Sequence, residues 1–237
     1  MAKRRVLITG AAGNIGTKLR DALKDKYDLI LLDRKNLDAE NALCADLANY
    51  DSNWAKHFAN VTTVIHLAGN PYEGAHWREL IPDNIDSVLN VCQACAERKV
   101  RRLIFASSCH TMGGYRDKDI GLITVDMEPL PDCDYGVSKL IGERICKSFS
   151  EGYPLSVICL RIGWVPRGDK RPDRGVNPWL RGLWLSNRDL VQVFEKSIEA
   201  KDIKFEILYA MSNNKGINWD LHTTMKALNF TPLDGIK

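Results

Sequence analysis

Three glycines spaced three residues apart, Gly10, Gly13 and Gly16, constrain the start of this chain more than any other feature. They separate an apolar run, residues 5–9, which has the pattern of a buried strand, from an amphipathic stretch, residues 15–26, which has that of a helix. Glycines at such a turn let the backbone turn tightly and approach a bound phosphate closely, and the free N–H groups of the helix N-terminus favour an anion. The turn, with Asn14 and Ile15 in it, therefore predicts a site for the phosphates of a nucleotide.

The first two-thirds of the chain alternates apolar runs with helical stretches. The predicted strands are residues 5–9, 29–32, 61–67, 102–107 and 155–162, and the predicted helices between them are residues 15–26, 84–99 and 135–150. Strands that are apolar on both faces and separated by helices indicate a parallel sheet covered on both sides. Because crossovers between parallel strands are right-handed, we expect an α/β protein with a doubly wound parallel sheet of the Rossmann type.

An acid at the end of the second predicted strand supports a dinucleotide ligand. Asp33 follows the glycine turn at about the 20-residue distance at which a carboxylate binds the adenosine ribose hydroxyls and repels a 2′-phosphate. Arg34 comes next and could hold that phosphate, so the sequence favours NAD over NADP without excluding the latter. Asp33 could also be a solvated acid at a strand end. Further candidates for contact with the dinucleotide along the sheet edge are Asp46, Leu47, Leu67, Ala68 and Gly69.

Composition changes near residue 165. Residues 165–178 are rich in proline, glycine and basic side chains, which predicts a loop, and a helix (187–200), a strand (205–209) and a short helix (220–228) are predicted after it. We therefore expect an NAD-binding domain over residues 1–164 and a small substrate-binding region, residues 165–237, packed on it.

A tyrosine and a lysine four residues apart open the predicted helix at 135–150. Tyr135 and Lys139 would share one helix face, so that the ammonium favours the phenolate and Tyr135 can act as a base. Ser108, just after the strand at 102–107, supplies a hydroxyl that could orient a reacting alcohol or carbonyl. The alternative for Tyr135 and Lys139 is a surface tyrosine beside a solvated lysine.

The composition excludes several other classes of protein. The net charge is only +3, from 33 basic and 30 acidic residues, so we expect no nucleic-acid or membrane partner. No apolar run approaches the roughly 20 residues of a membrane span, and no signal peptide is evident, so we expect a cytoplasmic protein. The seven cysteines are then expected to be free thiols. Cys92 and Cys95 form a C-x-x-C in a helical stretch with no second pair near it, so we expect no metal site.

The glycine turn, Asp33, the run 66–69, Ser107-Ser108 and Tyr135-x-x-x-Lys139, in this order, resemble the extended short-chain dehydrogenase/reductase family. Within it, residues 105–113, 135–139 and 160–163 are similar to uronate dehydrogenases, which oxidise the anomeric hydroxyl of a hexuronic acid to a lactone with NAD⁺. The resemblance implies that Ser108 and Tyr135 are the catalytic pair, that Lys139 assists them, and that His110 contacts substrate. Asn84 and Ile162 are further candidates for contact with the cofactor.

The chain departs from the uronate dehydrogenase pattern where the substrate would bind. Cys109 replaces an asparagine after the catalytic serine, Asn70-Pro71 replaces a serine, and Trp164 replaces a small polar residue. The arginine that pairs with the substrate carboxylate in the family would be Arg174 or Arg181 here. The candidate substrate-binding residues are accordingly Asn70, Ser108, Cys109, His110, Trp164, Arg174 and Arg181.

These features predict an NAD-dependent enzyme that oxidises a hydroxyl of a small anionic sugar acid. The resemblance to the family further implies a homo-oligomer, a dimer. Two alternatives share the core motifs. One is a nucleotide-sugar epimerase or dehydratase that keeps its NAD, and the other is a non-catalytic NAD-binding regulator.

Overall fold

A single parallel sheet of seven strands organises the computed structural model, which describes residues 3–216 and 218–237. The strand order is β3-β2-β1-β4-β5-β6-β7, so the predicted doubly wound fold is confirmed. The strands are β1 (Arg5–Thr9), β2 (Asp28–Asp33), β3 (Ala42–Cys44), β4 (Thr63–His66), β5 (Arg102–Ser108), β6 (Ser156–Ile162) and β7 (Phe205–Ala210).

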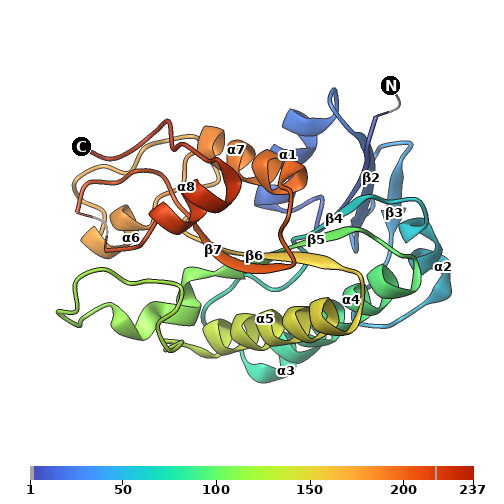
Figure 1. Ribbon diagram of the computed structural model, residues 1–237, viewed down its shortest axis with the longest axis horizontal. Helices are drawn as coiled ribbons and strands as arrows, with labels where there is room; N and C mark the ends of the chain where they lie inside the picture. Colours follow the sequence, from blue (N-terminus) through green and yellow to red (C-terminus); the bar gives the residue numbers. More distant parts are fainter. Residues whose placement is uncertain (1–2, 217) are drawn as a thin grey trace.

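Helices cover both faces of the sheet (Figure 1). On one face lie α1 (Asn14–Leu23), α7 (Asn187–Glu199) and α8 (His222–Leu228), and on the other α2 (Ser52–Ala55), α4 (Ser87–Glu97) and α5 (Asp134–Gly152). In β1 the side chains of Val6 and Ile8 pack under α1, while Leu7 packs on the opposite side. All three are fully buried, and each such side chain contributes about 1.5–3 kcal/mol, which is why the strands are apolar on both faces.

Short α-, 3₁₀- and π-helical segments occupy the connections. They are η1 (Lys56–Phe58), α3 (Trp77–Leu80), η2 (Ile81–Asp86), η3 (Cys109–Tyr115) and α6 (Pro178–Gly182). The helix predicted at 84–99 is thus preceded by a π-helical segment, η2, which runs directly into α4. Such segments are uncommon and often occur at functional sites.

The chain after residue 164 adds to the main sheet. Strand β7 pairs in parallel with β6, with Cys159 opposite Ile207, and α7 covers the same face as α1. A small separate cluster of apolar side chains joins this region to η3: Cys109, Met112, Ile123, Leu183, Tyr209, Met211, Trp219 and Leu221.

Within the described residues, no helix is both long and apolar enough to cross a membrane.

Candidate active site

A cavity of about 770 Å³ lies along the carboxyl ends of the parallel strands β1 and β4. At this point the chain leaves β1 toward β2 on one side of the sheet and leaves β4 toward β5 on the other. Ligands bind at this switch point in doubly wound sheets. The predicted residues that line it are Gly10, Gly13, Asn14, Ile15, Gly16, Asp33, Asp46, Leu47, Leu67, Ala68, Gly69, Asn70, Ser108, Cys109, His110, Tyr135, Lys139, Ile162 and Trp164. The structure therefore brings nearly all the candidates into one continuous space.

The glycine turn has the close contacts that exclude side chains. Gly10 has a φ of +67°, and a Cβ there would lie 2.7 Å from the backbone nitrogen of Ala68. At Gly16 a Cβ would lie 2.2 Å from the carbonyl oxygen of Gly10. Helix α1 has no side-chain cap and no acid in its first turn, so its N–H groups face the cavity without a competing anion. These features fit a dinucleotide phosphate at this place.

Asp33 is held at the end of β2 by two backbone donors. The nitrogen of Ala12 donates to its Oδ2 at 2.9 Å, and that of Lys35 to its Oδ1 at 2.9 Å. Arg34 turns to Asp83 instead, with Nη1 3.2 Å from both carboxylate oxygens. The fixed charge at the ribose position is therefore negative, which favours NAD over NADP.

A buried histidine fixes the chain just after β4. Thr9 Oγ1 lies 2.7 Å from His66 Nδ1 and accepts from the nitrogens of Leu67 and Ala68, each at 3.2 Å. Complete burial, reinforced by the charge of Lys139, lowers the pKa of His66 to about 3, so its ring is neutral. These bonds fix the position of the Ala68 backbone, which lies against Gly10.

Asn84 stands behind the cavity wall rather than in it, since it is 1% exposed and does not line the cavity. Its Oδ1 accepts from the nitrogen of Asn70 at 2.7 Å, and its Nδ2 donates to the carbonyl of Asn70 at 3.1 Å and to Ser138 Oγ at 3.0 Å. The π-helical segment η2 thus ties the loop after β4 to the first turns of α5.

Ser108 and Tyr135 face the cavity from two different elements. Ser108 ends β5 and caps η3, with its Oγ accepting from the nitrogen of His110 at 3.2 Å. Tyr135 lies in the first turn of α5. Burial raises the pKa of Tyr135 to about 12, although the Ser108 hydroxyl opposes this by hydrogen bonding to the phenol oxygen. The protein side chains alone thus keep the phenol protonated at neutral pH.

Lys139 lies one turn further along α5 and is 5% exposed. Its Nζ is 5.7 Å from the centre of the Tyr135 ring and 5.3 Å from that of Phe105. Burial lowers the pKa of Lys139 to about 8. The ammonium therefore stands beside the phenol as predicted, and with a pKa of about 8 it is still mostly protonated at pH 7.

His110 lies at the end of the cavity beyond the glycine turn, with acidic neighbours on both ring nitrogens. Its Nδ1 is 2.8 Å from Asp132 Oδ1, and its Nε2 is 3.4 Å from Glu73 Oε2. The ring meets that of Tyr135 edge-on, with centres 5.7 Å apart. His110 therefore lies next to the candidate base, Tyr135.

Some of the other candidate substrate residues line the cavity and some do not. Cys109 is 2% exposed, and its Sγ donates to the carbonyl of Arg161 at 3.4 Å, so it contributes to the floor. Trp164 lines the wall, and its backbone pairs with residues 183–185. Arg174 and Arg181 do not line the cavity, whereas Arg167 does.

Sequence reasoning missed Glu73 and Asp132 and did not single out Arg167. Lys18 Nζ donates to the carbonyls of Pro166 and Arg167, at 2.9 and 3.0 Å, which holds that loop over the glycine turn. Asp132 lies two residues before α5, the helix that carries Tyr135 and Lys139, and that position is a signal that could have identified it. The basic loop was recognised, but its sequence does not show which arginine points inward.

Comparisons with known proteins agree with this geometry. The NAD dependent epimerase/dehydratase family matches residues 6–180. A uronate dehydrogenase of Pseudomonas putida is 33% identical over 91% of this chain and 79% of its own, and an NAD-dependent glucose-6-phosphate dehydrogenase of Haloferax volcanii is 32% identical over 97% and 93%. The crystal structure of uronate dehydrogenase from Agrobacterium tumefaciens superposes with a TM-score of 0.84 at 27% identity, covering 99% of this chain and 86% of that one.

The family match covers most of the chain, and the expected serine, tyrosine and lysine lie in one cavity with the glycine turn and Asp33. The chain belongs to the NAD dependent epimerase/dehydratase family and is an NAD-dependent dehydrogenase of the extended short-chain dehydrogenase/reductase type.

Proposed function

We propose that this NAD-dependent sugar dehydrogenase oxidises the anomeric hydroxyl of a small sugar acid, as the uronate dehydrogenases that it resembles do, with Tyr135 as the general base. The single observation that carries the proposal is that Ser108 and Tyr135 line the same cavity as the glycine turn, with His110 edge-on to the phenol. The names of the relatives, uronate dehydrogenase and glucose-6-phosphate dehydrogenase, support a small sugar as the substrate class.

In this proposal the protein positions the hydroxyl and moves its proton. Bound NAD⁺ supplies the hydride acceptor and a positive ring that favours the phenolate. Ser108 Oγ orients the substrate oxygen by a hydrogen bond, and Tyr135 takes the proton from it. The charge of Lys139 opposes the rise that burial causes in the pKa of the phenol.

A guanidinium in the cavity lining supports an acidic group on the substrate. Arg167 lines the cavity and offers a guanidinium to a carboxylate. Glu73 also lines the cavity, where its Oε2 lies 3.4 Å from His110 Nε2.

The test is a tyrosine substitution combined with a substrate screen. Tyr135→Phe is expected to lower kcat by about 10²–10⁴-fold and to leave NAD⁺ affinity within a factor of a few. The control is Tyr153→Phe, because Tyr153 is an exposed tyrosine just after the same helix. NADH formation is measured with uronic acids, neutral aldoses, polyols and UDP-sugars. Turnover of UDP-sugars without net NADH, or undiminished turnover by the Tyr135→Phe variant, would contradict the proposal.

A further inference from the structure

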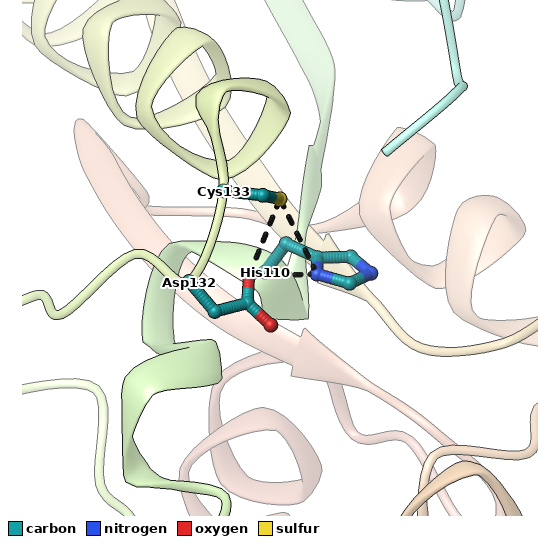
Figure 2. Close-up of side chains that lie close together, drawn as sticks. All are labelled: His110, Asp132 and Cys133. Carbon is teal, nitrogen blue, oxygen red and sulfur yellow. Dashed lines mark hydrogen bonds and ion pairs between the residues drawn. The ribbon is translucent and has the colours of Figure 1, made fainter. Parts of the chain in front are cut away.

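Three different metal-ligand atoms meet beside the active site, outside the reacting position (Figure 2). His110 Nδ1 lies 2.8 Å from Asp132 Oδ1, Cys133 Sγ lies 3.3 Å from the same oxygen, and Cys133 Sγ lies 3.8 Å from His110 Nδ1. Figure 2 shows the three side chains converging from η3 and from the segment that leads into α5.

These separations are close to those of a tetrahedral zinc site. With Zn–N and Zn–O bonds of about 2.0–2.2 Å and a Zn–S bond of about 2.3 Å, neighbouring ligand atoms stand roughly 3.3–3.7 Å apart. The two distances to sulfur already agree within about 0.5 Å. Only the His110–Asp132 distance must open, by a similar amount, as the hydrogen bond between them is exchanged for two metal bonds.

The surrounding backbone holds the three residues together. A Cβ at Gly113 would lie 2.1 Å from the Asp132 carboxylate, and one at Gly136 would lie 2.4 Å from the carbonyl of His110. Both glycines therefore make room for the close approach. Cys133 Sγ also accepts from the nitrogen of Gly136 at 3.4 Å as the cap of α5, which fixes the sulfur.

The Asp132 carboxylate favours a dication, whereas the Cys133 thiol proton and the charge of Arg116 oppose it. Burial opposes ionisation of Asp132, but the bonds from His110 and Cys133 and the charge of Arg116 lower its pKa, so it is a carboxylate. Burial raises the pKa of Cys133 to about 11, so binding converts a thiol to a thiolate and releases one proton to solvent. Arg116 Nη2 contacts Asp132 Oδ2 at 3.1 Å, which leaves Oδ1 for the metal but weakens binding by repulsion.

We propose that His110, Asp132 and Cys133 form an exchangeable site for one thiophilic divalent cation of the Zn²⁺ class, and that its occupation inhibits the enzyme. Three protein ligands leave the fourth tetrahedral position for water or a substrate oxygen, as in open zinc sites. A nitrogen, an oxygen and a sulfur ligand select Zn²⁺, Co²⁺ or Cd²⁺ over Mg²⁺ and Ca²⁺. Bound metal replaces the Asp132 hydrogen bond that orients His110, so it disturbs the substrate end of the cavity.

Binding is tested with Co²⁺, whose thiolate charge-transfer band reports a sulfur ligand directly. The full-length protein is expected to bind one Co²⁺ with such a band, and Zn²⁺ is expected to displace it. Cys133→Ser should abolish the band while keeping the helix cap, because serine is itself a preferred cap residue. The control is Cys44→Ser, since Cys44 is an exposed thiol on β3, away from the cluster.

Inhibition is tested separately, because it rests on the proposed dehydrogenase function whereas binding does not. Micromolar Zn²⁺ is expected to lower NADH formation at least 10-fold in wild type and Cys44→Ser, reversibly with EDTA, and to lower it less than 2-fold in Cys133→Ser. No Co²⁺ band in wild type, a band that survives in Cys133→Ser, or equal Zn²⁺ inhibition of both variants would overturn the proposal.

Discussion

Arg161 on β6 and Glu143 on α5 form a two-point ion pair in the core, with Nε 2.9 Å from Oε1 and Nη2 2.9 Å from Oε2. Each side chain is 1% exposed. Ser107 Oγ donates to Glu143 Oε1 at 2.6 Å. Because Ser107 precedes Ser108, and Glu143 lies two turns after Tyr135 in α5, this pair fixes the elements that carry the two candidate catalytic residues to one another.

Breaking this pair on one side is expected to cost far more than removing both members. Burial disfavours the guanidinium, but Glu143 outweighs this and raises the pKa of Arg161 above its ordinary value. Arg161→Met leaves Glu143 charged and buried, so we expect a loss of about 3–5 kcal/mol in the free energy of unfolding. The double variant Arg161→Met/Glu143→Met should recover most of that loss. Urea unfolding of wild type, Arg161→Met, Glu143→Met and the double variant measures the coupling, and additive losses would contradict it.

The parts of the fold that follow from local pattern were predicted well. Strands β1, β4, β5 and β6 are buried on both faces, so continuous apolar runs mark them in the sequence. Strand β3 was missed because its three residues, Ala42–Cys44, form a half-exposed edge without a β-branched run. The π-helical segment that contains Asn84 was also missed. The side chain of Asn84 bonds to Asn70 and Ser138, which are distant in the sequence, so no local pattern marks this segment.

In the candidate site, too, some residues could be predicted from the local sequence pattern and others could not. The glycine turn, Asp33, Ser108, Tyr135 and Lys139 lie at strand ends and helix starts, whose positions the pattern fixes. The arginine loop after β6 has no such pattern, so its register over the cavity depends on contacts such as those of Lys18. Neither the homodimer nor the anionic substrate is tested by these features, and both stay predictions.

Replacing Asp33 should relax the preference for NAD⁺ over NADP⁺. In Asp33→Ser the repulsion of a 2′-phosphate is removed, so we expect kcat/KM for NADP⁺ relative to NAD⁺ to rise at least 10-fold. Adding Asp83→Asn should increase the ratio further, because it weakens the pairing that holds Arg34 away. Initial rates with both cofactors measure this. A wild-type protein that already prefers NADP⁺ would contradict the role given to Asp33.

A methyl group at Gly16 should damage the phosphate turn. Its carbon would lie 2.2 Å from the Gly10 oxygen and 2.8 Å from Ala11 Cα, both backbone atoms that cannot move without opening the turn. Gly16→Ala is therefore expected to weaken NAD⁺ binding at least 10-fold and to lower Tm. Gly152→Ala is the matched control, since nothing lies within 4 Å of a Cβ there, and it should change stability by no more than about 1 kcal/mol. Isothermal titration calorimetry measures NAD⁺ binding and thermal melts measure Tm. Equal effects at Gly16 and Gly152 would count against a close approach of the backbone at Gly16.

Burying the Lys139 ammonium should cost stability at neutral pH, and the cost should disappear in alkali. Burial lowers its pKa from 10.5 to about 8, so below pH 8 both the folded and unfolded states carry the charge and the full penalty applies. Between pH 8 and 10.5 the unfolded state binds more protons, so wild-type stability rises with pH.

Lys139→Met is accordingly expected to be more stable than wild type at pH 7, by about 3 kcal/mol at most, with the difference shrinking from pH 8 to 10.5. The control Lys147→Met replaces a half-exposed lysine on the same helix and should shift stability by less than about 0.5 kcal/mol throughout. Denaturant unfolding at pH 7, 8, 9 and 10 measures both differences. A Lys139→Met protein that is less stable than wild type at pH 7, or whose advantage grows with pH, would show that the ammonium is stabilised in the fold rather than strained by burial.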